Sequence, residues 1–437
     1  FDEDIGYADS SCLQIEPSDA KIKLLRISKN QAFFSVTGLK ALRDYSATVR
    51  RVKDIAGNVM EDSVLYSFKT ISGDLQIKDD KENTNFAAYR GFEESSLNLK
   101  AYFKNDEIDI AQVALSVESP SNGVSVDSAG KVTINPRDLT NEEDVTVRIK
   151  AYQSSTEETS YYTVTVYSYY PVKMADDFSE NGNIRKNLNG RFKLMEDIVF
   201  SDDGSYSLNP IGSFTNVSDN NPFTGIFDGN GKTLSNFSLK AGTNNDENYA
   251  GLFAYNTGTI KNLKVDFASF DGSSIRNVGI ICGFNNGVIS GCEVKNISIN
   301  AESYVGGIAG LNTGTITDCI TSTASGEKIN ASANSAGGIA GFNNNGTISG
   351  KTYSTCDVSA SSEAGGLIGS MTGGTVNGTV NDKIYSSGTV TSSSNFAGGL
   401  IGKLESTVNP GTVTISNCSH TSGDVTGNDY VGGLIGH

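Results

Sequence analysis

Val305-Gly-Gly-Ile-Ala-Gly310 decides the fold, because variants of this stretch recur at a nearly fixed distance along the chain. Each of the seven copies carries one aligned aliphatic residue, and these are Leu252, Ile281, Ile308, Ile339, Leu367, Leu400 and Leu434. Consecutive copies lie 29, 27, 31, 28, 33 and 34 residues apart. A repeat of this length is typical of a solenoid, in which each coil packs only on its neighbours.

Five of the copies carry two adjacent glycines before the aliphatic residue. The pairs are Gly306 and Gly307, Gly337 and Gly338, Gly365 and Gly366, Gly398 and Gly399, and Gly432 and Gly433. Glycine has no Cβ, so backbone can pass close to backbone at these positions. We therefore interpret the glycines and the aliphatic residues as the structural core of the repeat, with the aliphatic side chains in one interior column.

An asparagine-containing turn follows each of the first four copies, at Asn256, Asn285, Asn312 and Asn343. Each turn leads into a β-branched pair such as Thr315-Ile316. Strand and turn alternating at one period predict a parallel β-helix. A leucine-rich horseshoe has a shorter period and more leucines, and a propeller blade needs about 40 residues. In register, the four asparagines are expected to form an amide ladder.

The cysteines follow the same repeat. Cys292, Cys319 and Cys418 each come three residues after an isoleucine, and Leu263 holds that place in another copy. Exchange of leucine with cysteine indicates an interior position. The six cysteines form no C-x-x-C pair, so we expect buried thiols and neither a disulfide framework nor a metal site.

The copies resemble the GLUG motif, which occurs in repeats of bacterial surface proteins. A second region, FKLMEDI at 192–198, PIG at 210–212 and FTGIFDGNGKTL at 223–234, resembles the leader that precedes such repeats. The same leader and repeats occur in the N-terminal part of streptococcal immunoglobulin A metallopeptidases and in adhesin-like proteins of gut bacteria. The resemblance covers about 171–437 and implies a GLUG-repeat β-helix with a leader and capping segment at 171–234. We expect a short helix near 174–178 to cover the unpaired edge of the first coil.

Residues 1–73 and 74–170 are predicted to form two Ig-like β-sandwiches, so the whole chain is expected to be all-β. The first has strand-like runs at 22–27, 31–36, 45–49 and 65–69. The second has runs at 97–102, 145–152 and 161–167, and a hairpin at 123–134 with its tip at 128–130.

Local motifs in these two regions support the prediction. Asp54-Ile-Ala-Gly-Asn58 resembles a turn of bacterial Ig-like and fibronectin-like modules, in which Leu42 and Tyr45 match a preceding L-x-x-x-Y that is one residue shorter here. The run G-V-S-V…G-K-V-T from Gly123 resembles bacterial Ig-like repeats, and such modules are usually spacers. We favour a hydrogen-bonded turn over a cation site for Asp54 and Asn58.

A tyrosine cluster ends the second region and allows two interpretations. Its members are Tyr161, Tyr162, Tyr167, Tyr169 and Tyr170. The rings could form an exposed platform for sugars, but alternation along the strand favours packing against the domain that follows.

The charge excludes two classes of partner. The chain has 437 residues and a formal net charge of −16, and few Lys and Arg fall in the repeats, so nucleic acid and anionic lipid are not expected to bind. No run is long enough for a transmembrane helix. The sequence begins at Phe1 without Met, and we expect any export signal or lipid anchor, such as that of an outer-membrane lipoprotein, to lie upstream.

Catalytic motifs are lacking. The only histidines are His420 and His437, so no H-E-x-x-H motif exists and the peptidase chemistry of the related enzymes does not carry over. Asp228-Gly-Asn-Gly231 resembles the start of a calcium loop, but Leu239 stands where such a loop ends in an acid, which favours a plain turn. We predict no cofactor and no metal.

Parallel β-helices also host polysaccharide lyases and glycosidases, which are the enzyme alternative. A glycosidase needs two carboxylates at a fixed separation. The acids nearest the early coils, Asp202, Asp203, Asp228, Asp266 and Glu293, do not recur at one position of the repeat and are interpreted as surface charge.

The function predicted from the sequence is that of a non-catalytic bacterial cell-surface protein, an adhesin whose Ig-like spacers present the solenoid. Its partner would be a host or bacterial surface glycan or protein; the sequence leaves the oligomeric state open. We expect contacts in loops where the coils are longer, at 321–334, 377–387 and 405–411. Tyr385 is the candidate ligand-contact residue, and drift in unconstrained loops is the alternative explanation of their lengths.

Overall fold

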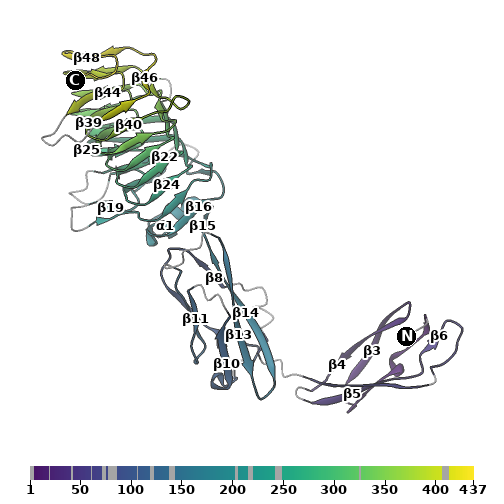
Figure 1. Ribbon diagram of the computed structural model, residues 1–437. Helices are drawn as coiled ribbons and strands as arrows, with labels where there is room; N and C mark the ends of the chain where they lie inside the picture. The colour runs from purple at the N-terminus through teal and green to yellow at the C-terminus, as the bar shows by residue number, and fades with distance from the viewer. Residues whose placement is uncertain are drawn as a thin grey trace. The chain divides into compact units, whose positions relative to one another are not determined.

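A computed structural model describes residues 4–18, 20–40, 43–60, 62–70, 75–76, 86–105, 107–118, 123–136, 143–201, 205–214, 220–241, 249–323, 326–405 and 413–437. Strands dominate, as expected for an all-β chain. The chain forms two compact units. The first contains Phe1–Ala88, Glu94–Asn135 and Asp144–Val166. The second contains Tyr89–Glu93, Pro136–Glu143 and Tyr167–His437. Figure 1 shows the stacked coils of the second unit.

Three parallel sheets build the second unit. We call the first the threonine sheet; it contains β15 (Tyr170–Val172), β16 (Arg191–Leu194), β21 (Ile226–Asp228), β24 (Thr259–Lys261), β27 (Val288–Ser290), β30 (Thr315–Thr317), β35 (Thr347–Ser349), β40 (Thr375–Asn377) and β45 (Thr414–Ser416). The asparagine sheet contains β23 (Phe253–Asn256), β26 (Cys282–Asn285), β29 (Ala309–Asn312), β34 (Ala340–Asn344), β39 (Ile368–Thr372) and β44 (Ile401–Glu405).

The long sheet has 17 strands and completes each coil. It contains β17 (Ile198–Val199), β18 (Ser207–Leu208), β22 (Thr233–Leu239), β25 (Lys264–Gly279), β28 (Glu293–Gly306), β31 (Ile320–Thr323), β32 (Ile329–Ala331), β33 (Ser335–Gly337), β36 (Tyr353–Ser354), β37 (Val358–Ala360), β38 (Glu363–Gly365), β41 (Ile384–Ser386), β42 (Val390–Ser392), β43 (Phe396–Gly398), β46 (Cys418–His420), β47 (Val425–Thr426) and β48 (Tyr430–Gly432). Its strands pair in parallel, in register from coil to coil. The predicted parallel β-helix is confirmed.

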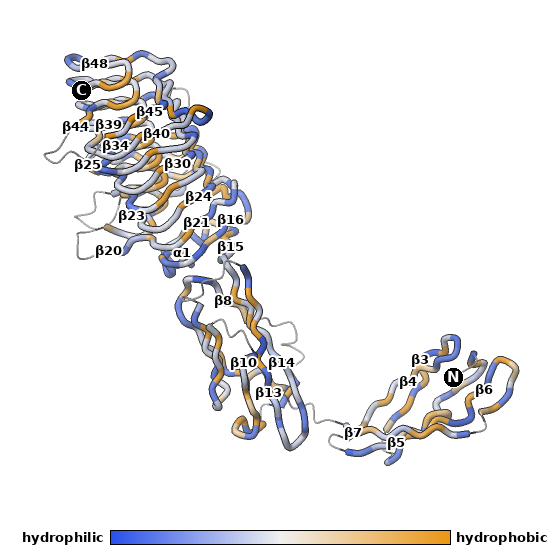
Figure 2. The backbone as a smooth tube through the Cα atoms, viewed as in Figure 1, coloured by the Kyte–Doolittle hydropathy of each residue, from blue (hydrophilic) through white to orange (hydrophobic). Residues whose placement is uncertain are grey.

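The predicted aliphatic column lies inside the coils. Backbone hydrogen bonds join its members in order, for example from Ile308 N to Ile339 O (3.0 Å) and from Ile339 N to Leu367 O (2.9 Å). Six of the seven side chains are at most 2% exposed. Leu434 has the same register but is 48% exposed, because it lies in the last coil of this sequence. In Figure 2, hydrophobic stretches recur from coil to coil along the tube of the solenoid.

The glycines stand where a side chain would collide, for three different reasons. A Cβ at Gly306 would lie 2.1 Å from the Ala309 oxygen, so the first glycine permits the tight corner. A Cβ at Gly338 would lie 2.0 Å from Ser354 Oγ, because that buried side chain packs onto the second glycine from another wall. A Cβ at Gly341 would lie 2.1 Å from the backbone of the preceding coil. A Cβ at Gly338 would also lie 2.4 Å from the backbone oxygen of Gly366 in the next coil. The predicted close backbone approach is therefore confirmed for both glycines of the pair, and the third glycine was not part of that prediction.

The amide ladder is present. Asn256 Nδ2 donates to Asn285 Oδ1 (2.8 Å), Asn285 to Asn312 (2.8 Å) and Asn312 to Asn343 (2.7 Å). All four side chains are fully buried. The ladder ends because Met371 takes the next position in register.

A short cap precedes the repeats, as expected. The 3-10 helix η5 (Ala175–Phe178) and helix α1 (Asn183–Lys186) bury Phe178 and Ile184 over the first coils. Arg185 ties this cap to the coil below through Nη1 to the Pro210 oxygen (2.6 Å). The leader does more than cap, since its strands β16 and β21 pair in the threonine sheet. Its strands β19 (Ser213–Phe214) and β20 (Asn220–Asn221) form an antiparallel pair.

The first unit is built from small antiparallel sheets. In chain order its elements are β1 (Ile5–Tyr7), η1 (Ser10–Cys12), β2 (Leu13–Glu16), β3 (Lys21–Ser28), β4 (Gln31–Thr37), β5 (Asp44–Val49), β6 (Lys53–Asp54), β7 (Val64–Lys69), β8 (Phe86–Tyr89), β9 (Ser95–Asn98), η3 (Leu99–Tyr102), η4 (Ile110–Gln112), β10 (Val113–Val117), β11 (Val124–Val126), β12 (Lys131–Ile134), β13 (Val145–Gln153) and β14 (Glu158–Tyr167). The four strands expected before residue 73 are present. The Ig-like assignment and the limits at 73 and 170 stay predictions.

One strand prediction in this unit is wrong. Residues 97–102 alternate in sequence, but the chain leaves strand β9 at Asn98 and turns into η3. The Asn98 side chain accepts a hydrogen bond from Lys100 N (3.0 Å), and Leu99 is fully buried. A local cap thus replaces the strand. The predicted hairpin at 123–134 is present as β11 and β12.

Candidate ligand-binding surface

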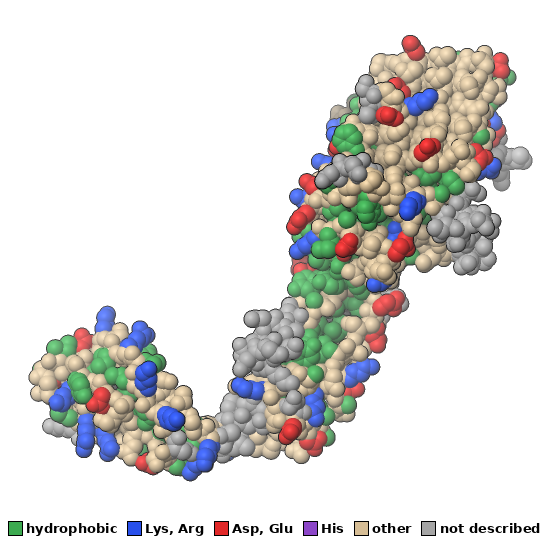
Figure 3. All heavy atoms as spheres, turned by 180° about the vertical axis from the view of Figure 1, so that it is seen from behind, with side chains coloured by type: hydrophobic (Ala, Val, Ile, Leu, Met, Phe, Trp, Pro, Cys, Tyr) green, Lys and Arg blue, Asp and Glu red, His purple; other side chains and the backbone are tan. Residues whose placement is uncertain are grey.

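The threonine sheet presents two outward rows of short side chains, since only the middle residue of each repeat strand points inward. One row is Thr259, Val288, Thr315, Thr347, Thr375 and Thr414, and the other is Lys261, Ser290, Thr317, Ser349, Asn377 and Ser416. Hydroxyl groups therefore dominate this surface. Seen from behind the view of Figure 1, the last coils of the solenoid present mostly backbone and uncharged polar atoms, and the earlier coils also carry charged and hydrophobic side chains (Figure 3).

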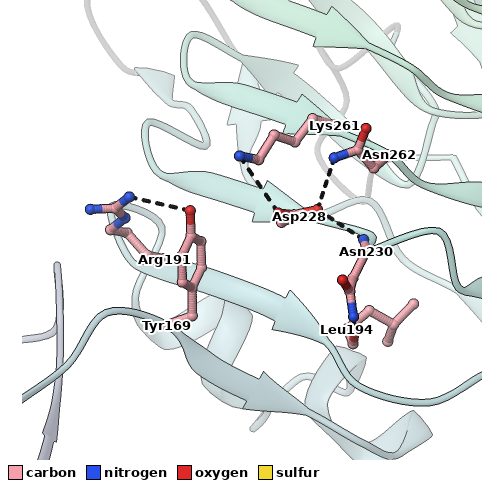
Figure 4. Close-up of polar contacts among 7 residues, drawn as sticks. All are labelled: Tyr169, Arg191, Leu194, Asp228, Asn230, Lys261 and Asn262. Atoms are coloured by element: carbon pink, nitrogen blue, oxygen red, sulfur yellow. Dashed lines mark hydrogen bonds and ion pairs between the residues drawn. The ribbon is translucent and has the colours of Figure 1, made fainter. Parts of the chain in front are cut away.

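Near the first coils, Asp228 lies in a small polar network (Figure 4). Its carboxylate accepts from Asn230 N (2.8 Å) and Asn262 Nδ2 (3.3 Å), and Lys261 Nζ lies 3.5 Å away. This is a hydrogen-bonded turn with an ammonium group beside it, the arrangement favoured over a calcium loop. Within the described residues, no three His, Cys, Asp or Glu side chains gather as a metal site would require.

The other nominated acids also have partners. Asp266 accepts from Asn296 Nδ2 (2.7 Å), and Glu293 pairs with Lys295 (2.5 Å). Asp202 and Asp203 lie outside the described residues. In the first unit, Asp54 accepts from both Asn58 N and Asn58 Nδ2 (2.7 Å each), which is the predicted turn; Leu42 lies outside the described residues.

Most rings of the tyrosine cluster have a covered face. Tyr170 packs on Phe92 and Phe192 of the first coils, with ring centroids 5.4 and 6.0 Å apart, and Tyr167 stacks on Tyr89 at 5.6 Å. Tyr162 is buried. An arginine lies over each remaining ring: the Arg148 guanidinium over Tyr161 at 4.1 Å, and that of Arg191, seen in Figure 4, over Tyr169 at 4.8 Å. Packing at a strand end therefore describes the cluster better than a sugar platform.

A second group of rings fills the inward corner made by the glycines. Tyr255 and Phe284 stack at 4.7 Å, and Phe214 meets both rings edge-on. Further along, Tyr304 stacks on Phe342 at 5.2 Å. Because these rings pack on one another, they complete the packing of the corner.

Tyr353 and Tyr385 form a third group, on the outer side of the long sheet. Their rings are 4.5 Å apart and only 7° from parallel. They occupy one column, which runs Ile320, Tyr353, Tyr385, Ser419 through successive coils. The candidate residue Tyr385 therefore has a stacking partner that the sequence analysis missed. Both tyrosines hold the same position in successive coils, and this could have indicated their stacking. That correspondence can be recognised only once the strand register is known.

The structure describes part of the three variable loops at 321–334, 377–387 and 405–411. Between β40 and β41, five more residues intervene than between β45 and β46, because Val376 pairs with Ile415 and Ile384 pairs with Cys418. The extra residues form an exposed turn whose Val380 is 80% exposed. Of 377–387, residue 377 ends β40 and residues 384–386 form β41, and of 321–334, residues 321–323 and 329–331 are strand. Most of 405–411 lies outside the described residues.

The thiols are interior and unpaired. Cys292, Cys319 and Cys356 are at most 1% exposed, and all six cysteines are free. Burial raises the pKa of the Cys319 thiol well above its usual range and that of Cys356 to about 11. The expected buried thiols are confirmed at Cys292 and Cys319, whereas Cys418 is half-buried.

Comparisons with known proteins give one partial similarity. The chain matches no protein-family model and no solved structure. It is 32% identical over 162 residues to halomucin of Haloquadratum walsbyi, a match that covers 35% of this chain and 2% of halomucin. The chain therefore spans a small part of that relative's length. Among the described residues, no helix has the length and apolar character needed to cross a bilayer.

Proposed function

We propose that the chain belongs to a non-catalytic bacterial cell-surface protein, an adhesin in which Ig-like spacers present a GLUG-type solenoid to a glycan or protein of a host or neighbouring cell. The observation that carries the proposal is the outward surface of the threonine sheet, whose two rows of hydroxyl-rich side chains run through six coils. A regular and rigid surface made mostly of uncharged side chains is suited to recognition.

The acids nominated for the enzyme alternative do not support it. A lyase or glycosidase on this scaffold would need facing acids that are free to exchange protons. Asp228, Asp266 and Glu293 are each held by a lysine or an asparagine within 3.5 Å. These contacts favour a structural use of the carboxylates.

A location outside the cell fits this use, with a lipid anchor as one means of attachment. The similarity to a segment of halomucin is in keeping with a surface protein. The acidic composition, with 50 Asp and Glu against 34 Lys and Arg, argues against nucleic acid as the partner.

The test compares binding with turnover. The full chain is immobilised on beads and incubated with epithelial cells, bacterial cells, extracellular-matrix proteins and a panel of polysaccharides. We expect retention of at least one of these surfaces and no release of reducing ends or unsaturated sugars from any polysaccharide. Depolymerisation that disappears in an Asp228→Asn variant would overturn the non-catalytic assignment, and absence of any binding would overturn the adhesin.

A further inference from the structure

The geometry points to a saccharide-binding subsite on the open ring face of Tyr385, taking neutral sugars. This inference deepens the proposed function, on which it rests, by naming a ligand class and the residues that contact it. It starts from the column of Tyr353 and Tyr385, in which Tyr385 stacks on a ring on one side and has a serine in register on the other.

The register leaves this face open. On one side Tyr385 stacks on Tyr353, and on the other its partner in the next coil is Ser419. A serine side chain is too short to cover a phenol ring. By contrast, the next coil places Tyr430 against Phe396, with 5.1 Å between centroids. Within the described part of the chain, Tyr353 supplies the one ring that contacts Tyr385.

The ring is held rigidly, which a stacking site needs. Strand β41 fixes the backbone of Tyr385, and the parallel ring of Tyr353 supports its other face. Partial burial and the neighbouring phenol raise the pKa of Tyr385, so the ring stays neutral. A rigid aromatic side chain loses little conformational entropy when a ligand stacks on it.

Polar residues precede and follow Tyr385 along the chain. The inserted turn before β41 is closed by hydrogen bonds from Thr379 N to Asp382 O (2.8 Å) and from Asp382 N to Thr379 Oγ1 (2.9 Å). It ends at the exposed Lys383, two residues before Tyr385 and thus on the same side of the chain. Ser387, two residues after Tyr385, adds a hydroxyl on the other side.

This combination selects a sugar. A pyranose ring presents C–H groups on its faces and hydroxyls on its rim, so an aromatic face with polar groups beside it matches both. Asp382 and Lys383 cancel in charge, and the chain carries a net charge of −16, so a polyanion would gain no attraction here. A neutral saccharide is therefore the ligand class that fits.

The experiment measures affinity by isothermal titration with the full chain and neutral hexasaccharides of β-glucan, xylan, mannan and galactan, with hyaluronate as the anionic comparison. Tyr385→Ala removes the ring, Tyr385→Phe keeps it, and Ser419→Tyr covers its open face in the way Tyr430 covers Phe396. Tyr161→Ala, which removes a 43% exposed ring in the first unit, is the matched control. Thermal unfolding of each variant confirms that it folds.

We expect at least one neutral hexasaccharide to bind. Tyr385→Ala and Ser419→Tyr should each lose roughly tenfold in affinity, the effect of removing one well-placed ring contact, while Tyr385→Phe and Tyr161→Ala stay near the parent. Unchanged affinity in both Tyr385→Ala and Ser419→Tyr would overturn the subsite. If the protein retains cells or matrix proteins but binds no saccharide, the subsite is refuted and the adhesin function is not. If it binds nothing at all, both proposals are refuted.

Discussion

Replacing Asn312 with methionine should destabilise the solenoid more than the same replacement at Asn343, although both side chains are fully buried in one column. Methionine is a fair test residue, because Met371 occupies the next place in that column. The two positions differ in their ladder bonds. Asn312 accepts one from Asn285 and donates one to Asn343, whereas Asn343 takes part only in the latter.

The magnitude follows from the groups left behind. Asn312→Met leaves a donor on Asn285 and an acceptor on Asn343 without ladder partners, and each unsatisfied buried group costs about 1–3 kcal/mol. Asn285 Nδ2 retains longer contacts to the oxygens of Gly287 (3.4 Å) and Thr315 (3.3 Å), which reduces its share. We expect a loss of about 2–4 kcal/mol for Asn312→Met and about half of that for Asn343→Met.

Hydrogen–deuterium exchange with mass spectrometry resolves these changes coil by coil, because each coil of a solenoid opens with its neighbours. The free energy of opening is read from peptides that cover 279–345 in the parent and both variants. Met371→Leu, which keeps an apolar side chain of similar volume, is the control and should cost less than about 1.5 kcal/mol. Equal losses for Asn312→Met and Asn343→Met would refute the ladder as a source of stability.

Three further outcomes are expected. Ile308→Asp should unfold the neighbouring coils and leave the first unit intact, since it buries an unpaired charge at a cost of several kcal/mol; an unchanged calorimetric trace would contradict this. Gly341→Ala should lower the melting temperature of the second unit, because its Cβ would lie 2.1 Å from the carbonyl carbon of Tyr304; urea titration measures the loss. Burial raises the pKa of Cys356 to about 11, above the ordinary thiol value near 8.5, so the folded state keeps a proton that the unfolded state releases. The protonated Cys356 thiol therefore makes its full contribution to the free energy of unfolding below about pH 8.5, and this contribution declines up to about pH 11. In urea titrations across this pH range, Cys356→Ala should show a smaller decline in the free energy of unfolding than the parent.

The parallel coils could be predicted from the sequence because one position per coil must be aliphatic and its neighbours must be glycine. Ile308 and Ile339 stack as the spacing indicates. For the second glycine, the close approach of backbone could be predicted, but the side chain that packs onto it could not. Gly338 faces Ser354, which lies 16 residues later on another wall, and no local pattern joins the two.

Short irregular strands limited the prediction elsewhere. The leader strands β16 and β21 contain four and three residues and lack the paired glycines of the later copies, so the sequence did not show them as coils. At 97–102, clean alternation indicated a strand, but the side chain of Asn98 caps the turn that begins at Leu99. A single local hydrogen bond outweighed the pattern there.

The candidate site, too, could be predicted only in part from the sequence. Tyr385 could be nominated from its place beside a variable loop, but its open face depends on which residues precede and follow it in the stack. Tyr353 and Ser419 lie 32 and 34 residues away, and only the register makes them its neighbours.

The neighbours of each solenoid residue discussed above depend on the parallel stacking of the coils. One distance tests this stacking directly. Val288 and Thr414 occupy the same outward row of the threonine sheet, four coils apart, and both are exposed. Spin labels on cysteines introduced at these two sites allow the separation to be measured by double electron–electron resonance, since the native thiols are mostly buried. Four coils at about 4.8 Å each predict a separation near 19 Å. A distribution centred beyond about 30 Å, more than six such spacings, would contradict the parallel solenoid.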